Sequence, residues 1–150
     1  MAATHVLMKM QIEPVMRQKL AEYCDGIELK PRTMPIRWNG EGTGSFEFDA
    51  ASEDGAIVAC LSTAGNLYPG QRHKLTRDAA FMWLVPNAQR HILAVVEPHV
   101  ADALIAMRSR GRIPPKTEIV VIELPADVRQ QLLNFRKKAS VEVGGQVEPL

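Results

Sequence analysis

Hydrophobic residues follow a helical period near the start of the chain. After Pro14, which suits the first position of a helix, apolar side chains recur near helical spacing as far as the Asp25-Gly26 stop signal. This pattern predicts a helix from Pro14 to Cys24. The preceding stretch, "THVLMKMQI", fits an additional helical turn and a short strand equally well.

The pattern changes to that of strands in the next part of the chain. Three apolar stretches between residues 31 and 63 are separated by "NGEGTG" and "SEDG", which are typical hairpin connections. They predict three antiparallel strands, at about Met34–Trp38, Ser45–Ala50 and Ala56–Ser62. No GK[ST] sequence follows the glycines of the first turn, so this turn is not predicted to be a phosphate-binding loop.

The second half of the chain alternates amphipathic helices with short apolar runs. Leu75, Ala79 and Met82 lie along one face of a predicted helix at 71–85. The runs "RHILAVVE" and "TEIVVIEL" are typical of buried strands, and each precedes a predicted helix, "PHVADALIAMRSRG" and "PADVRQQLLNFRKKA" respectively. A three-stranded antiparallel meander followed by such units predicts an α/β fold with a mixed β-sheet flanked by helices.

Composition places the chain among ordinary globular proteins, with 46% hydrophobic and 23% charged residues. We expect one domain over residues 1–140 and a flexible tail over residues 141–150. The longest apolar runs, such as "ILAVV", are too short to cross a bilayer, which predicts a cytoplasmic protein with no membrane partner. Cys24 and Cys60 lack the spacing of a zinc site, and we expect them to be reduced thiols.

Charge is unevenly distributed, although the net charge is only +1. Residues 1–70 hold six Lys and Arg against nine Asp and Glu, whereas residues 71–138 hold twelve against six. An acidic half beside a basic half suits a metal site next to a phosphate-binding surface. Ordinary scatter of surface charge gives the same imbalance, so both interpretations stay open.

Two carboxylates lie on one side of the predicted hairpin. In "SFEFDAA", the two phenylalanines face one side of the strand while Glu47 and Asp49 face the other, because side chains alternate along a strand. In the strand that follows, Cys60 and Ser62 share a face. We expect that face to lie beside Asp49.

This arrangement resembles the PD-(D/E)XK superfamily, whose restriction-endonuclease-like core consists of a helix, a three-stranded antiparallel meander, a helix and another strand. The predicted element order matches that core over roughly residues 14–96. In the superfamily, an acid ends the second core strand, and (D/E)-X-K follows across a hairpin; together they bind a divalent metal and position water. Asp49 matches the acid, whereas the (D/E)-X-K acid and lysine fall on Cys60 and Ser62.

The resemblance implies a site for Mg²⁺ at Asp49 and Glu47, with Lys74 as a relocated lysine. Glu13, or alternatively Glu22, supplies a further carboxylate, as first-helix acids do in some relatives. The chain is then either a metal-dependent DNA nuclease, with Asp49, Glu47 and Lys74 as catalytic residues, or a degenerate and inactive relative. A non-catalytic interaction or scaffold protein is the alternative, which the missing acid and lysine favour.

A basic stretch, "RSRGRIPPK", ends the predicted helix at 98–111. It carries four cations suited to contacting DNA phosphates without reading a base sequence, namely Arg108, Arg110, Arg112 and Lys116. Cations also suit a helix C-terminus for purely structural reasons. DNA and a second copy of the chain are the partners that the resemblance predicts, because nucleases of this fold often pair.

Overall fold

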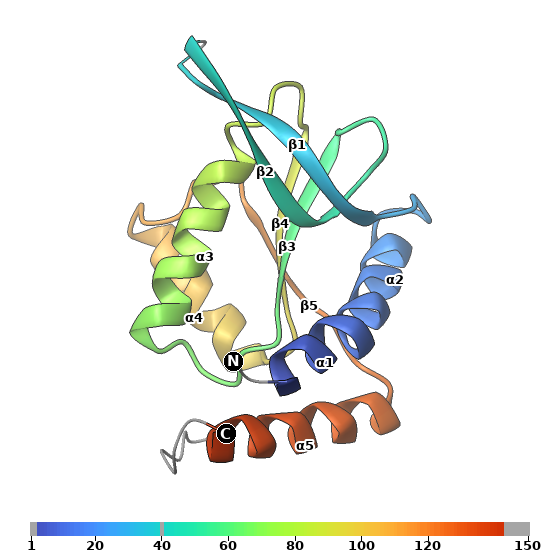
Figure 1. The fold of residues 1–150 in the computed structure, drawn as a ribbon. Coiled ribbons are helices and arrows are strands. Elements are labelled where there is room, and N and C mark those ends of the chain that lie inside the picture. The colour runs from blue at the N-terminus through green and yellow to red at the C-terminus, as the bar shows by residue number, and fades with distance from the viewer. Residues whose placement is uncertain (1–2, 40, 143–150) are drawn as a thin grey trace.

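The computed structural model describes residues 3–39 and 41–142 and has an α/β architecture, a five-stranded mixed open sheet with helices on both faces (Figure 1). The helices are α1 (Ala3–Gln11), α2 (Glu13–Tyr23), α3 (Pro69–Met82), α4 (Pro98–Ser109) and α5 (Ala126–Glu142). The strands are β1 (Lys30–Trp38), β2 (Glu41–Ala51), β3 (Ile57–Ser62), β4 (Arg90–Val95) and β5 (Glu118–Val121).

The strands lie in the sheet in their order along the chain, from β1 to β5. The β1–β2 and β2–β3 pairs are antiparallel, whereas β3, β4 and β5 run parallel to one another. Parallel neighbours need a long crossover, and α3 and α4 provide the two crossovers. The loops that follow β3 and β4 therefore lie at one end of the sheet, and the loops that precede β4 and β5 lie at the other.

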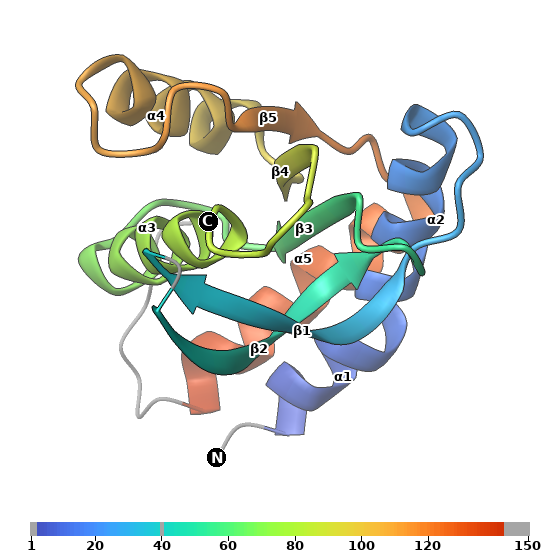
Figure 2. The same ribbon diagram turned by 90° about the horizontal axis from the view of Figure 1, so that it is seen from above.

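Helices lie on both faces of the sheet, as Figure 2 shows from above, and an apolar layer lies between the sheet and the helices on each face. Helices α1, α2 and α5 pack on one face, where Met16, Leu20 and Leu132 are fully buried against alternate residues of β3 and β4. Helices α3 and α4 pack on the other face, where Leu75 and Leu104 are buried. None of the helices within residues 3–39 and 41–142 combines the length and apolar character that a membrane crossing requires.

Most of the predicted elements are present, with three differences. The ambiguous "THVLMKMQI" stretch is helical and forms α1, which continues almost directly into α2. β1 and β2 are longer than predicted, because β1 begins at Lys30 and β2 begins at Glu41. β5, predicted to be a buried strand, lies at the edge of the sheet with Val121 exposed. Most of the predicted tail, residues 143–150, lies outside the described residues.

The predicted meander does not form a three-stranded unit of its own. β2 pairs with β3 over only two residue pairs, Ala50 with Ala59 and Ala51 with Val58, and most of β2 pairs with β1 alone. The β1–β2 hairpin consequently extends beyond the rest of the sheet, at the top of Figure 1. The five-stranded mixed sheet is therefore the architecture, and the first three strands are one side of it.

β2 changes its facing at a β-bulge near Asp49. Lys30 pairs with Ala51 and Arg32 with Phe48, so β2 has one more residue than β1 between these two pairs. Phe48 and Ala51 consequently pack under α3 and α4, while Ala50 packs in the opposite layer. This bulge marks the place where the hairpin separates from β3.

Candidate functional site

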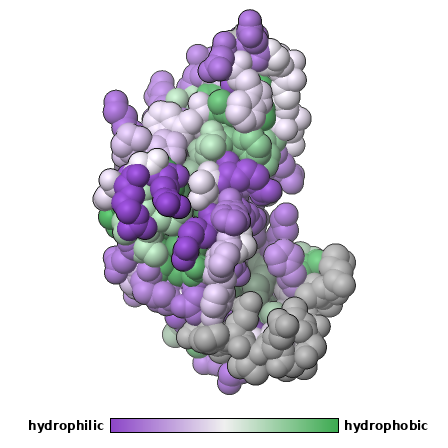
Figure 3. All heavy atoms as spheres, turned by 90° about the vertical axis from the view of Figure 1, so that its left-hand side faces the viewer, coloured by the Kyte–Doolittle hydropathy of each residue, from purple (hydrophilic) through white to green (hydrophobic). Residues whose placement is uncertain are grey.

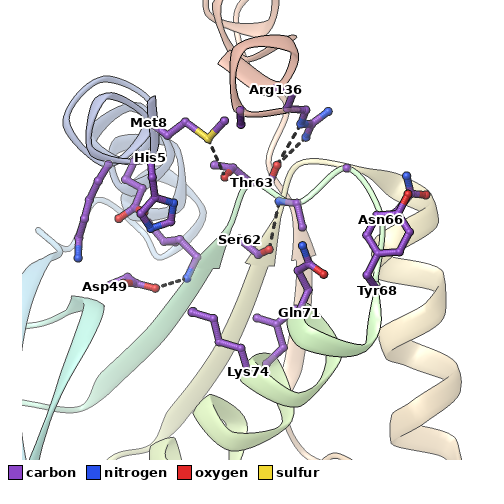
Figure 4. A pocket seen from close by; sticks show the side chains of 17 residues that line it. His5, Met8, Asp49, Ser62, Thr63, Asn66, Tyr68, Gln71, Lys74 and Arg136 are labelled. Atoms are coloured by element: carbon purple, nitrogen blue, oxygen red, sulfur yellow. Dashed lines mark hydrogen bonds between the residues drawn. The ribbon is translucent and has the colours of Figure 1, made fainter. Parts of the chain in front are cut away.

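A cavity of about 300 Å³ lies at the carboxyl end of β3, and we refer to it as the pocket (Figure 4). Its wall combines segments that are distant in sequence: α1, the start of α2, the end of β2, the loop after β3, the start of α3, and α5. The polar side chains that matter below are those of Lys9, Glu13, Asp49, Ser62, Lys74 and Arg136. The pocket thus places carboxylates and cations from five elements around one space, and the loop after β3 adds uncharged residues to its wall.

Asp49 lies in β2 at the point where β2 and β3 separate. Its Oδ2 accepts a hydrogen bond from the backbone N–H of Leu61 at 2.8 Å, beyond the last strand pair. Burial raises the pKa of the Asp49 carboxyl above its ordinary value, although the hydrogen bond from Leu61 and the charge of Lys74 act in the opposite direction. The Asp49 side chain therefore contributes to the sheet and to the pocket together.

Glu13 begins α2 and lines the same pocket. Its Oε1 is buried without a hydrogen-bond partner among the described residues, and the nearest cation, Arg17 Nη1, lies 3.7 Å away. Burial, reinforced by the charge of Asp49, raises the pKa of Glu13 from 4.5 to about 7, against the opposing charges of Lys9 and Arg17. A carboxyl group with an unsatisfied buried oxygen suits a proton or a cation as its partner.

Lys74 reaches the pocket from the first half of α3. Its Nζ donates to Asp78 Oδ2 at 2.9 Å, and Arg77 Nη2 donates to the other carboxylate oxygen, Oδ1, at 3.1 Å. Burial lowers the pKa of Lys74, but the hydrogen bond and charge of Asp78 outweigh burial and raise the pKa above its ordinary value. Lys74 is therefore a permanent positive charge near the two carboxylates.

Arg136 of α5 lies at the opposite end of the pocket from Lys74 (Figure 4). Its Nε and Nη2 donate to the Thr63 carbonyl at 3.2 and 2.7 Å, and its Nη1 donates to Glu97 Oε2 at 2.7 Å. A Cβ on Gly65 would lie 3.5 Å from the guanidinium, an ordinary contact distance, so the loop lies directly against Arg136. Arg136 thus fixes the loop that forms one wall of the pocket.

The carboxylates of the pocket fit a lightly coordinated cation. No group of three or more His, Cys, Asp and Glu side chains converges to hold a metal within residues 3–39 and 41–142. Glu13 and Asp49 remain as a pair, and Mg²⁺ is commonly held by one or two carboxylates, with waters and substrate phosphates completing its shell. The unpartnered oxygen of Glu13 fits this role, because a cation would satisfy it.

The structure brings together three of the four residues predicted for the catalytic and metal site. Asp49, Glu13 and Lys74 line the pocket, whereas Glu47 is exposed on the hairpin and does not line it. Glu47 shares a side of β2 with Asp49, as predicted, because Phe46 and Phe48 both pack in the layer under α3 and α4. It is outside the pocket because it lies in the part of β2 that pairs with β1 alone. Glu22, the alternative to Glu13, is exposed on α2 and is also outside the pocket.

The two positions that depart from the superfamily pattern have different surroundings. Ser62 lines the pocket, and its Oγ accepts the Ala64 N–H at 3.2 Å. Cys60 is buried in the layer under α3, where burial raises the pKa of its thiol well above the ordinary value. Cys60 packs within that layer and does not line the pocket, so it does not take the place of the (D/E)-X-K acid there.

The basic residues predicted to contact DNA lie at the other end of the sheet. Arg110, Arg112 and Lys116 are exposed in the loop that precedes β5, whereas the pocket is at the end that follows β3. Arg108 is partly buried and donates to the Thr117 carbonyl at 2.7 Å, which is a structural bond within that loop. These four residues therefore do not contribute to the pocket.

Arg136 is the part of the pocket that sequence reasoning missed. It is 73 positions away from Thr63 along the chain, and its helix gives no motif that marks it. No family model, no curated protein and no solved structure matches this chain.

Proposed function

We propose that the chain is a metal-dependent nuclease of the restriction-endonuclease-like type, with a rearranged PD-(D/E)XK site. The observation that carries the proposal is the convergence of Glu13, Asp49 and Lys74 on one pocket from α2, β2 and α3. Glu13 replaces the third-strand acid and Lys74 replaces the third-strand lysine. The strand order and directions are also those that such a core requires.

Each residue has a distinct part in the proposed hydrolysis of a phosphodiester. Glu13 and Asp49 would hold Mg²⁺, which supplies charge neutralisation and a more acidic bound water when present. The ammonium group of Lys74, held by Asp78, would stabilise negative charge on the phosphate during attack by water. Arg136 would keep the Thr63 to Gly65 wall in place.

Metal binding and cleavage can be tested separately. We expect Mn²⁺ or Mg²⁺ at millimolar concentration to raise the melting temperature of the wild type, and Glu13→Gln and Asp49→Asn to abolish the rise. Asparagine keeps an oxygen that can accept the Leu61 N–H, so the sheet is retained. Glu22→Gln and Glu47→Gln are matched controls outside the pocket and should leave the metal response unchanged.

Cleavage is then measured on labelled DNA with added Mg²⁺ or Mn²⁺. Lys74→Met should retain the metal response and lose cleavage by a factor of about 10² or more, the usual effect of removing a group that stabilises transition-state charge. A wild type that shows no melting shift at millimolar metal would contradict the proposal.

A non-catalytic relative is the second candidate, and one observation favours it. The Asp49 carboxylate already bonds to Leu61, and Lys74 already bonds to Asp78, so both groups have structural partners. This candidate predicts metal binding without cleavage of any DNA form, or neither property. Metal-dependent cleavage that Lys74→Met removes would exclude it.

A further inference from the structure

Asp78 holds two cations at the surface of α3 in fixed positions. Its side chain is only 3% exposed, whereas the side chains of Lys74 and Arg77 that bond to it are 52% and 54% exposed. One carboxylate cannot neutralise two cations, so this part of α3 keeps a net positive charge. Charged donors held in place by a buried carboxylate lose little freedom when they bind an anion such as a phosphate.

An aromatic cluster adjoins these cations. Phe46 of β2 lies against Phe81 of α3 with ring centroids 4.7 Å apart, and Trp38 of β1 meets Phe81 edge-on at 5.9 Å. The Arg77 guanidinium lies 5.9 Å from the centre of the Phe46 ring. Trp38 is the exposed member, with 54% of its surface accessible, and its edge contact with Phe81 positions it.

Two elements connect this aromatic cluster to the pocket over similar lengths. On α3, Lys74, Arg77 and Phe81 follow one another at helical spacing on one face, so Phe81 lies about 10 Å from Lys74 along the axis. On β2, Phe46 and Asp49 are three residues apart, again about 10 Å. This length equals roughly three steps between bases stacked at the 3.4 Å spacing of duplex DNA.

The surroundings favour a negatively charged occupant. The hairpin and α3, residues 30–51 and 69–82, carry six Lys and Arg against four Asp and Glu, and one of the four is the neutralised Asp78. Figure 3 shows the side of the molecule that carries α3 and α4, where hydrophilic side chains cover most of the face and hydrophobic ones gather in its upper part, towards the hairpin. A surface of aromatic rings interleaved with cations is what unpaired bases and their phosphates bind.

We infer that the surface formed by Trp38, Phe46, Lys74, Arg77 and Phe81, the strand track, binds single-stranded DNA and leads it into the pocket. Trp38 stacks on a base, Arg77 contacts a phosphate, and Lys74 is where the track meets the pocket. The inference rests on the proposed nuclease function, because the strand is led towards the pocket where cleavage is proposed. It deepens that function by naming an unpaired strand as the substrate. Base stacking on the track requires bases that are not paired in a duplex.

Binding can be measured without any catalysis. The probe is fluorescein-labelled dT12 in EDTA, and the readout is fluorescence anisotropy against protein concentration at several NaCl concentrations. We expect the wild type to bind dT12 at least tenfold more tightly than a 12-base-pair duplex. Trp38→Leu should weaken dT12 binding by about 5- to 100-fold, while Trp38→Phe, which retains a ring, should weaken it much less.

Salt dependence separates the role of Arg77 from that of Trp38. Arg77→Gln should reduce the slope of log K against log [NaCl] by about 0.7, the value for one phosphate contact with a single strand, whereas Trp38→Leu should leave the slope unchanged. Matched controls lie away from the strand track. Tyr23→Leu removes an exposed aromatic side chain from α2, and Arg110→Gln removes an exposed arginine from the loop before β5. Neither control should alter dT12 binding.

Several results would overturn the inference. One is absence of dT12 binding at 50 mM NaCl, and another is duplex binding as tight as dT12 binding. A third is an equal loss of dT12 affinity in folded Trp38→Phe and Trp38→Leu variants, and a fourth is a larger loss of affinity for Arg110→Gln than for Arg77→Gln. Tighter binding of rU12 than of dT12 would overturn the assignment to DNA. Because no metal is present, these results do not depend on cleavage, so the strand track and the nuclease can fail separately.

Discussion

Two buried carboxylates at the same end of the sheet have opposite electrostatic surroundings. Glu97 accepts hydrogen bonds from Arg129 and Arg136, and these two partners outweigh burial and lower the pKa of its carboxyl. Glu13 has an unpartnered buried oxygen and Asp49 as a neighbour, and its pKa is raised to about 7.

The comparison separates a structural ion pair from a candidate reactive site. Arg136 and Glu97 satisfy each other and hold the loop after β3, so nothing further is needed there. The buried oxygen of Glu13 needs a proton or a cation as its partner. Carboxyl groups that have a perturbed pKa and line a cavity are concentrated at functional sites. Burial is common to both, and the difference is that two arginines donate hydrogen bonds to Glu97, whereas Arg17 lies 3.7 Å from Glu13 Oε1 without a hydrogen bond.

The largest expected effect comes from breaking the paired cluster. Arg136→Met should lower the free energy of unfolding by about 3 kcal/mol, because it leaves Glu97 short of a partner and the Thr63 carbonyl without two donors. Arg129→Met is the control; its side chain is 37% exposed, and we expect the loss to be about 1 kcal/mol. Urea denaturation at pH 7 measures both. Equal losses would show that the position of Arg136 at the loop has no structural importance.

The second effect concerns the dependence of stability on pH. Because the pKa of Glu13 is raised on folding, its contribution is fully present below 4.5 and is lost as pH rises through about 7. The pKa of Glu97 is lowered, so its contribution is present above 4.5 and is lost as pH falls through the lowered value. The two carboxyl groups therefore respond to pH in opposite directions.

Substitution by glutamine should make this difference visible. At pH 8 and without metal, Glu13→Gln should raise the free energy of unfolding by on the order of 2 kcal/mol, because it removes a buried charge. Glu97→Gln should lower it at the same pH, because it removes the charge that two arginines require. Denaturation of both variants between pH 4 and pH 9 provides the measurement. A destabilised Glu13→Gln at pH 8 would show that Glu13 is satisfied in a way that the structure does not contain.

The smallest effect tests the neighbours of Glu13. Lys9 lines the pocket and its charge lowers the pKa of Glu13, so Lys9→Gln should move that pKa further upward. Lys19→Gln, on the same helix as Glu13 but outside the pocket, is the matched control and should leave it unchanged. Carboxyl ¹³C NMR titration of Glu13 measures both variants. A downward movement in Lys9→Gln would contradict the geometry described for α1.

The order of helices and strands was predictable because spacing of apolar residues distinguishes the two. The residues at which these elements begin and end were harder to predict. β1 begins four residues before the predicted start because Pro31 and Pro35, which argue against a central strand, are acceptable in an edge strand. The edge position of β5 depends on what lies beside it, and an apolar run carries no information about that.

Some residues of the candidate site could be predicted because the resemblance assigns a role to a residue type at the end of a given strand or helix. The resemblance to the PD-(D/E)XK core implied Asp49, Lys74 and, with Glu22 as the alternative, Glu13, and these three residues line one pocket. Glu47 lies outside the pocket because β2 pairs with β3 only at Ala50 and Ala51, and "SFEFDAA" gives no sign of where that pairing ends. Arg136 and the pairing of Trp38 with Phe81 join segments more than 40 residues apart, and only the folded chain brings them together.

The hydrogen bond between Asp49 and Leu61 has an evolutionary consequence. Because the carboxylate completes the junction of β2 and β3, replacing Asp49 carries a folding penalty whether or not the pocket is catalytic. A lineage that abandons the chemistry would still be selected to retain an acceptor at this position, while Glu13 would be free to drift, since its replacement relieves a buried charge. Retention of Asp49 in related proteins would then indicate only shared descent, whereas retention of Glu13 would indicate that the pocket still functions.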